Sequence, residues 1–425
     1  MSDQLGTSNI IGDSLSDTEQ CMMPISVDAS PEQWPAPVPS LAREPGAATP
    51  ATTLAELTTM RVGGPVGEYV EATTEAEMID AVRQADDAGR PLLVIGGGSN
   101  IVASDAGFDG LVLRDSRQEV SLLADDRCGG VEISATAGTT WDDLVRQAVA
   151  SQWGGFETLS GIPGTVGAAP VQNIGAYGTE VAELLASVRV WDRAAGQALQ
   201  LPLSRLRLSY RDSELKRSLT DPQVGGGRTW GPTGRWVVLS ATFSVRQASL
   251  SSPIAYNQLA QALGTEPGER VDALAVREAV LDLRRSKGMV LDPGDHDTWS
   301  AGSFFTNPVL TTEQAEHLPA DAPRYPVTDH TRVVPGTVPA PVVEGLVKTS
   351  AAWLIEHAGF SKGFSVACEG AAGPAASLST KHVLALTNRG SARARDVTDL
   401  RDAVVEGVRR AYGIMLVPEP VHVGW

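Results

Sequence analysis

The segment Leu159–Gly178 constrains the fold of this chain more than any other part of the sequence. Its twenty residues contain five glycines and five alanines, serines or threonines, so it offers little bulk for packing a core. Glycine lets the backbone approach a ligand closely and adopt turns that other residues avoid. The segment is therefore a poor packing element, and we interpret it as a cradle for a large flat or phosphorylated ligand.

A second glycine-rich segment, Ile95–Asn100, directly follows a short apolar strand predicted at residues 91–95. Successive backbone N–H groups in such a turn can bind an anion. The segment is not a dinucleotide-binding fingerprint, because Ile101 stands where the third glycine belongs. A plain tight turn explains it equally well when it is taken alone. Two small-residue loops together favour a dinucleotide-sized ligand over two separate turns.

The surrounding pattern is typical of mixed α and β structure. Thr74 and Glu77 form a capping box that begins a helix, which is predicted to end at Gly89. Apolar residues that alternate or recur at helical spacing predict the other elements. Strands are expected at 131–137 and 236–245, helices from Thr140 and at 276–283, 351–358 and 397–412, and loops at 220–234 and 319–341.

Composition limits the classes of function. A chain of 425 residues suggests two or three domains, and a formal net charge of −17 argues against nucleic-acid or anionic-membrane partners. No apolar run is long enough to span a bilayer, and no signal peptide is visible. The three cysteines and six histidines form no zinc motif. We expect a cytoplasmic, metal-independent protein whose proline-rich, acidic residues 1–50 are a disordered tail.

Three isolated polar residues have ordinary interpretations when they are considered singly. Arg211 is more typical of a structural ion pair, Ser303 of a turn cap and Glu419 of a solvated charge. No serine lies in a G-x-S-x-G elbow, so nucleophilic hydrolysis finds no support. Residue chemistry alone therefore indicates an α/β protein that binds a ligand with phosphates and rings.

Six strings of the sequence, taken together, resemble the UDP-N-acetylenolpyruvoylglucosamine reductase (MurB) family. They occur in the family's order between about Leu54 and His422, which makes the resemblance specific. The strings are TMRVGGP (59–65), VIGGGSN (94–100), SGIPGTVGAAPVQNIGAYG (160–178), YRDS (210–213), AGSFFTNP (301–308) and STKHVLALTNRG (379–390).

The resemblance implies an α+β fold with two domains. Residues 51–248 would form an FAD-binding domain of the vanillyl-alcohol-oxidase (PCMH) type, completed by a C-terminal strand at about 414–425. Residues 249–413 would form an α/β substrate-binding domain. The family reduces FAD with NADPH and passes hydride to the enolpyruvyl ether of a UDP-sugar, which gives UDP-N-acetylmuramate. A monomer is also expected by this likeness.

The resemblance also implies roles for individual residues. Arg211 matches an arginine that meets negative charge as it develops on the substrate carboxylate, and Glu419 matches a glutamate beside that carboxylate. Ser303 matches the serine that gives a proton to C2. The matching FAD contacts are Arg61, Gly96, Gly97, Gly98, Ser99, Asn100, Gly161, Ile162, Pro163, Gly164, Thr165, Gly167, Ala168, Asn173, Gly175 and Ala176.

Substrate contacts carry over in the same way. Tyr256 and Lys287 match the residues that hold the diphosphate, and Tyr256 suggests the subgroup that closes a tyrosine-bearing loop over the substrate. Asn307 would orient Ser303 or the substrate. The alternatives are a flavin oxidase of the same fold that acts on another substrate, and a catalytically silent nucleotide-binding protein. Arg211, Ser303 and Glu419 together argue against both.

The positions of the histidines add one expectation. No histidine precedes His296, so the FAD-binding half cannot form a histidyl–flavin bond. We therefore expect FAD to be held non-covalently, with Cys128 as the one theoretical exception.

Overall fold

The computed structural model describes residues 53–126, 130–329, 341–366 and 373–425. Within these ranges, no helix combines the length and the apolar character needed to cross a lipid bilayer. The tail expected at residues 1–50 lies outside the described residues.

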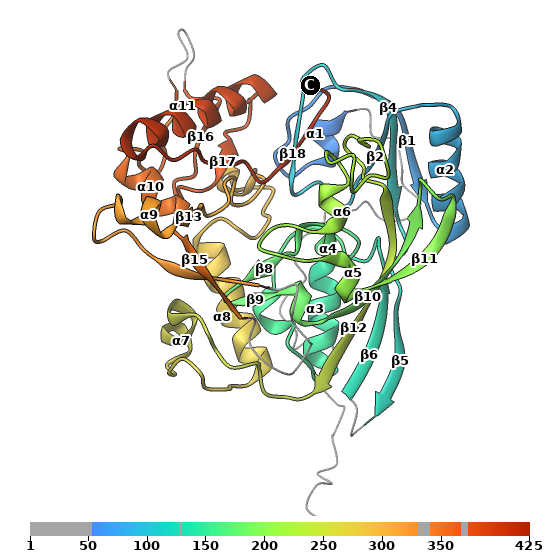
Figure 1. Cartoon of the computed structure of the whole chain (residues 1–425), viewed down its shortest axis with the longest axis horizontal. Helices are drawn as coiled ribbons and strands as arrows, with labels where there is room; N and C mark the ends of the chain where they lie inside the picture. Colours follow the sequence, from blue (N-terminus) through green and yellow to red (C-terminus); the bar gives the residue numbers. More distant parts are fainter. Residues whose placement is uncertain (1–52, 127–129, 330–340, 367–372) are drawn as a thin grey trace, which may run out of the picture. The chain divides into compact units, whose positions relative to one another are not determined.

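A small parallel sheet begins the described chain (Figure 1). Its strands are ordered β1-β4-β2, and both pairings are parallel. A parallel sheet buries apolar residues on its faces, and here one face is covered by a helix. The elements are α1 (Leu54–Leu57), β1 (Val66–Ala72), α2 (Glu75–Asp87), β2 (Leu92–Val94) and β4 (Phe108–Asp115).

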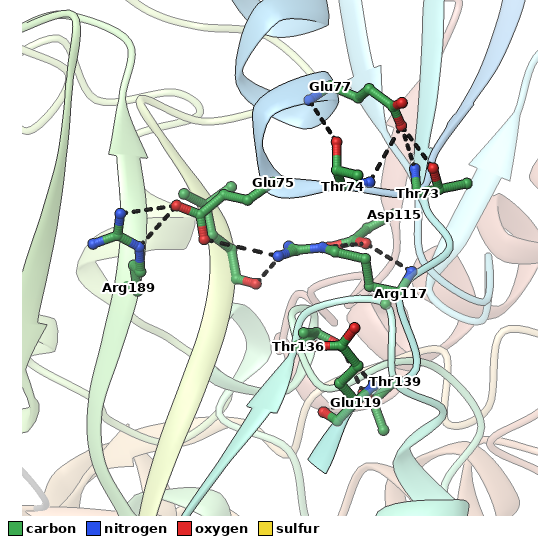
Figure 2. Close-up of polar contacts among 12 residues, drawn as sticks. Thr73, Thr74, Glu75, Glu77, Asp115, Arg117, Glu119, Thr136, Thr139 and Arg189 are labelled. Carbon is green, nitrogen blue, oxygen red and sulfur yellow. Dashed lines mark hydrogen bonds and ion pairs between the residues drawn. The ribbon is translucent and has the colours of Figure 1, made fainter. Parts of the chain in front are cut away.

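Helix α2 packs on this sheet through one apolar face. Met78 and Val82 are fully buried in a cluster with Leu111 and Leu113 of β4. The expected capping box is present, because the Thr74 hydroxyl accepts from the backbone N–H of Glu77 and the Glu77 carboxylate accepts from that of Thr74, both at 3.2 Å (Figure 2). The predicted helix is confirmed.

A larger antiparallel sheet follows, with strand order β11-β10-β12-β6-β5, and β7 pairs with β12. Helix α3 covers one of its faces. Trp141, Phe156 and Phe243 meet there with ring centroids 5.3–6.1 Å apart. The elements are β5 (Val120–Asp126), β6 (Gly130–Thr136), α3 (Trp141–Ala150), β7 (Trp153–Gly154), β10 (Leu185–Asp192), β11 (Gln197–Pro202) and β12 (Trp236–Gln247).

A chain of charged groups joins the two sheets (Figure 2). Arg117, just after β4, donates to the Asp115 carboxylate through Nε at 2.9 Å and Nη2 at 2.6 Å. Its Nη2 also donates to the carbonyl of Leu239 on β12 at 2.8 Å. Glu75, at the start of α2, lies 3.8 Å from Arg117 and accepts from Arg189 of β10. These contacts fix β4, β12, β10 and α2 relative to one another.

Short elements between α3 and β12 carry the residues of the small-residue segment and of its surroundings. Two strand pairs also lie outside the main sheets: β3 pairs with β18 in parallel, and β8 pairs with β9. The elements are β3 (Ile101–Ala103), η2 (Glu157–Leu159), α4 (Ala169–Gln172), β8 (Gly175–Ala176), β9 (Thr179–Glu180), η3 (Val181–Glu183), α5 (Leu203–Leu206), α6 (Glu214–Arg217) and β18 (Val421–Val423).

The C-terminal part is richer in helices. Its core includes Phe304, Leu354 and Val397, together with Met60 and Val102 from the N-terminal part of the described chain. The elements are α7 (Asn257–Leu263), α8 (Ala273–Ser286), η4 (His296–Thr298), β13 (Val309–Thr311), α9 (Thr312–Glu316), β14 (Tyr325–Thr328), β15 (Val342–Lys348), α10 (Ala351–His357), β16 (Ala376–Leu378), β17 (Leu386–Asn388) and α11 (Ala394–Tyr412).

The expectation of a loop at 319–341 is wrong in part. Residues Tyr325–Thr328 form β14, which pairs with β15, and residues 330–340 lie outside the described ranges. Prolines obscured the strand, although β14 is an edge strand of the order β13-β15-β14, where a proline is tolerated. The predicted domain boundaries remain predictions.

One buried ion pair ties α8 to α3. Both Nη atoms of Arg277 donate to the Asp142 carboxylate at 2.7 Å, and both side chains are buried. The Oδ1 atom of Asp142 also accepts from the backbone N–H of Gly161 at 2.6 Å. The pair therefore fixes the start of the small-residue segment as well as the two helices.

Loss of Arg277 should strongly destabilise the protein. Arg277→Met leaves the Asp142 carboxylate buried without its cation, so we expect the free energy of unfolding to fall by about 3–5 kcal/mol. Urea unfolding followed by circular dichroism, at equal FAD saturation, measures this change. Arg285→Met on the same helix removes only an exposed pair with Asp282 and should cost less than about 1 kcal/mol. Equal costs for the two variants would contradict the structural role of Arg277.

Candidate active site

The two glycine-rich loops and the three isolated polar residues line a single cavity of about 340 Å³. Arg211, Ser303 and Glu419 all reach it, although they are far apart in the sequence. Its wall includes twelve of the expected cofactor contacts: Gly96, Gly97, Gly98, Ser99, Asn100, Ile162, Pro163, Gly164, Thr165, Gly167, Ala168 and Gly175.

The two loops touch each other at a point where only glycine fits. A Cβ atom added to Gly97 would lie 2.8 Å from the Cα of Gly164, which is closer than real contacts allow. The Ser99 hydroxyl crosses the same junction and donates to the carbonyl of Pro163 at 2.9 Å. The loops therefore form one continuous backbone surface.

This surface offers hydrogen-bond donors. The backbone N–H groups of Gly97, Gly98 and Ser99 donate to no residue that the structure describes. Consecutive N–H groups without a protein acceptor suit an anionic diphosphate. The apolar remainder of the wall, which includes Ile162 and Trp236, suits flat rings. The residues present thus fit a dinucleotide such as FAD.

Arg211 is held at both its backbone and its guanidinium. Its φ is +55°, an unusual value for a residue other than glycine, within a tight turn closed by two hydrogen bonds between Ser209 and Asp212. Its Nη1 donates to the carbonyl of Asn173 at 3.2 Å and its Nη2 to that of Gly175 at 2.7 Å. The charge is therefore fixed before any ligand binds.

Glu419 lies beside this arginine in the cavity wall. Its Oε1 lies 3.4 Å from Nε of Arg211 and accepts from Nε2 of Gln172 at 2.8 Å. Its backbone N–H donates to the carbonyl of Phe304 at 2.9 Å. That last bond brings the neighbour of Phe304, Ser303, to the same end of the cavity.

Two cations near Arg211 were not identified from the sequence. Lys216 lines the cavity and donates through Nζ to the carbonyl of Arg211 at 3.2 Å, and burial lowers the pKa of Lys216. Arg284 lines it as well, and burial lowers the pKa of Arg284. The only signal for Lys216 in the sequence was its position five residues after Arg211. The site therefore concentrates positive charge in an acidic chain.

Comparison with known proteins decides the family. The model described as "FAD binding domain" matches residues 67–201, and the model described as "UDP-N-acetylenolpyruvoylglucosamine reductase, C-terminal domain" matches residues 292–423. The UDP-N-acetylenolpyruvoylglucosamine reductase of Cutibacterium acnes is 47% identical over 371 residues, covering 87% of this chain and 89% of that one. The chain belongs to the UDP-N-acetylenolpyruvoylglucosamine reductase family.

Other relatives agree with this assignment. The enzyme of the same name from Nocardia farcinica is 50% identical over 375 residues, covering 88% of this chain and 89% of its own. The MurB structure from Thermus caldophilus has a TM-score of 0.53 at 23% identity and covers 88% of this chain and 97% of its own, which supports the fold. The predicted family, α+β fold, oxidoreductase class and FAD cofactor are confirmed.

Four residues expected to contact FAD do not line the cavity, and their assignment remains a prediction. The guanidinium of Arg61 stacks on the Trp299 ring, 3.9 Å from its centroid. The N–H of Gly161 is taken by Asp142, and Ala176 lies in the β8–β9 pair. Asn173 is buried and donates through Nδ2 to the carbonyl of Ser209 at 2.8 Å, beneath the Arg211 turn.

The two residues expected to hold the substrate diphosphate belong to a neighbouring cluster. Tyr256 meets Tyr177 edge to face, with centroids 5.6 Å apart. The Nζ of Lys287 lies 5.7 Å from the centroid of Tyr177 and donates to the Gln258 side chain at 2.6 Å. Burial lowers the pKa of Lys287, and Arg284 lowers it further. Tyr177 and Gln258 were not singled out from the sequence.

Asn307 is not among the residues that line the cavity, and it contacts other residues of the protein instead. Its side-chain oxygen accepts from the backbone N–H of Ala351 at 3.0 Å, at the start of α10. Its backbone N–H donates to the Tyr210 hydroxyl at 3.4 Å. Lys348 lies over the Tyr210 ring, 4.5 Å from the centroid. Asn307 therefore steadies the residue next to Arg211. Its contact with substrate remains a prediction.

Substitution of Gly97 tests the junction of the loops. Gly97→Ala forces the loops apart, so we expect FAD binding to weaken by about 1–2 kcal/mol, which is about 5- to 30-fold in Kd. Titration of the apoprotein with FAD, followed by quenching of flavin fluorescence, measures this. Gly294→Ala is the matched control, because a Cβ there meets its nearest neighbour at an ordinary 3.4 Å. An unchanged Kd for Gly97→Ala would contradict the assignment of this junction to the cofactor.

His382 should make stability depend on pH. Burial, with the nearby Lys287 and Lys362, lowers the pKa of His382 from 6.5 to about 4. Between these values the unfolded chain binds a proton that the folded chain does not, so stability falls as pH decreases through this window, by up to about 3 kcal/mol. Urea unfolding from pH 7 to pH 4 should show a flatter dependence for His382→Gln than for the parent. The exposed His317→Gln serves as the control, and parallel curves for His382→Gln and the parent would contradict this role.

Proposed function

We propose that this chain reduces the enolpyruvyl group of UDP-N-acetylenolpyruvoylglucosamine to give UDP-N-acetylmuramate, a step of peptidoglycan precursor synthesis, with NADPH as the hydride donor. The observation that carries this proposal is that Arg211, Glu419 and Ser303 line the same cavity as the two glycine-rich loops that suit FAD. The same three residues disfavour an oxidase of this fold. We also propose that the protein works in the cytoplasm as a monomer and holds FAD non-covalently.

The proposed reduction requires particular groups beside the enolpyruvyl group of the substrate. FAD held by the two glycine-rich loops would, in its reduced form, be the source of the hydride for C3 of the enolpyruvyl group. Negative charge then develops at C2 and spreads into the attached carboxylate. Arg211 has N–H groups left after its two carbonyl bonds, and its fixed guanidinium can meet this charge as it forms. A preorganised cation stabilises the transition state more than the ground state.

Ser303 would complete the reduction by donating its hydroxyl proton to C2. Gly302, with φ of +72°, makes the turn that presents Ser303 to the cavity. Serine is a weak acid, so alignment must supply the efficiency, and the alkoxide must regain a proton from solvent. Over the whole step, one hydride and one proton are added across the C2–C3 double bond.

The remaining cations would hold the anionic parts of the ligands. Lys287, beside Tyr177 and Tyr256, is proposed to bind the substrate diphosphate. Tyr256 is 47% exposed and stands immediately before α7, where a ligand can reach its hydroxyl. Membership of the subgroup with a tyrosine-bearing loop rests on this residue and is part of the proposal.

Anaerobic half-reactions test this function in one experiment. NADPH should bleach the flavin absorption band, and the enolpyruvyl UDP-sugar should restore it. Ser303→Ala should leave the first step nearly unchanged and slow the second by about 100-fold or more, because only the second needs the proton. Thr306→Val, in the same segment with its hydroxyl directed to the carbonyl of Val417, is the control.

Other outcomes would overturn parts of the proposal. Flavin that is reoxidised by oxygen but not by the sugar nucleotide would favour an oxidase. Equal loss in both half-reactions would make Ser303 a structural residue.

A further inference from the structure

Gln172 occupies a special place in the cavity wall. It is the last residue of α4, and the next residue, Asn173, ends the helix in a left-handed conformation with φ of +46°. The Gln172 side chain is almost fully buried but reaches the cavity surface. The resemblance to known reductases gave this residue no role.

Gln172 contacts Glu419, a residue with a proposed part in the reduction, rather than a residue with a purely structural role. Its Nε2 donates to Oε1 of Glu419 at 2.8 Å, which is an ordinary hydrogen-bond length, whereas the Arg211 Nε lies 3.4 Å from the same oxygen. The other oxygen, Oε2, forms no hydrogen bond with a residue that the structure describes. The two oxygens of Glu419 are therefore not equivalent.

We propose that Gln172 is a positioning residue that holds Oε1 of Glu419 as a hydrogen-bond acceptor and thereby directs Oε2 to the substrate carboxyl group. Oε1 accepts a hydrogen bond from the Gln172 amide and forms an ion pair with the Arg211 guanidinium, so it has no favourable place for a proton of its own. Any proton that Glu419 carries is then located on Oε2, where it can be donated to the substrate carboxylate. This inference rests on the proposed role of Glu419 in the reduction.

The same turn also holds the partner of Glu419. Asn173 donates through Nδ2 to the carbonyl of Ser209, which opens the Arg211 turn, and through its own carbonyl accepts from Arg211. Its Oδ1 accepts from the backbone N–H of Ala182 at 3.3 Å. Consecutive residues at the end of α4 thus fix the carboxylate and the guanidinium relative to each other. A rigid base for Gln172 is what a positioning role requires.

Another role would give a different result. The side-chain oxygen of Gln172 has no hydrogen-bond partner among the described residues, so this amide could contact a bound ligand directly. In that case, its effect would not depend on Glu419. A double-mutant cycle separates the two roles, because coupling energies appear only between groups that act together.

The experiment measures reoxidation of the reduced enzyme by the enolpyruvyl UDP-sugar, in stopped flow and without oxygen. Four proteins form the cycle: the parent, Gln172→Met, Glu419→Ala and the double variant. Gln172→Met should slow reoxidation by about 10- to 100-fold, the range expected for loss of a hydrogen bond to a charged group. It should have less than about a twofold effect in the Glu419→Ala background. Gln200→Met is the matched control, because the exposed amide of Gln200 donates to the Ser187 hydroxyl.

The pH profile gives a second readout that a packing role would not change. Gln172→Glu should regain activity at low pH, where the introduced carboxyl group is protonated and can again donate to Oε1, and lose it as pH rises. FAD content is checked in each variant by absorbance.

Each outcome of the cycle has a separate meaning. A large loss in Glu419→Ala but none in Gln172→Met overturns the role of Gln172 and leaves the proposed function intact. An equal loss from Gln172→Met in both backgrounds also overturns it and points to direct ligand contact. If Glu419→Ala itself reoxidises at the parental rate, the proposed function of Glu419 fails.

Discussion

The buried carboxylate of Asp142 is the constraint on which the shape of the cavity depends. It accepts two hydrogen bonds from Arg277 of α8 and one from the backbone N–H of Gly161. A carboxylate in a dry interior is tolerated only when its lone pairs are satisfied, so the three partners must keep their places together. Because Gly161 opens the small-residue segment, the contact that stabilises the core also fixes one wall of the active site.

Positive charge in the cavity explains how an acidic protein can bind anionic ligands. The formal net charge is −17, yet Arg211, Lys216 and Arg284 line the same cavity as Glu419. Lys216 and Arg284 are poorly solvated in the cavity wall, and this burial lowers the pKa of each. An anionic ligand replaces that missing solvation. The positive charges gathered in the cavity therefore attract anionic ligands, although the net charge of the whole chain is negative.

Sequence reasoning predicted the parts of this site that depend on local pattern. The capping box of α2, the two glycine loops and the order of the six strings needed no knowledge of tertiary contacts. The partners of Glu419 did need it, because Gln172 lies 247 residues away in the chain. Asn173 was expected to contact the cofactor. Its side chain is buried beneath the Arg211 turn, and its contact with FAD remains a prediction.

Backbone strain occurs in and near the Arg211 turn. Arg211, Asn173 and Tyr177 all have φ near +50°, a conformation that costs about 1–2 kcal/mol for a residue with a side chain. Glycine would remove that cost but would also remove the guanidinium, the amide and the ring that make the contacts. The hydrogen bonds around Asn173 offset the strain at Asn173 and Arg211 and hold these two residues in one arrangement. The fold thus holds the Arg211 guanidinium in place, which is what its proposed role beside developing negative charge requires.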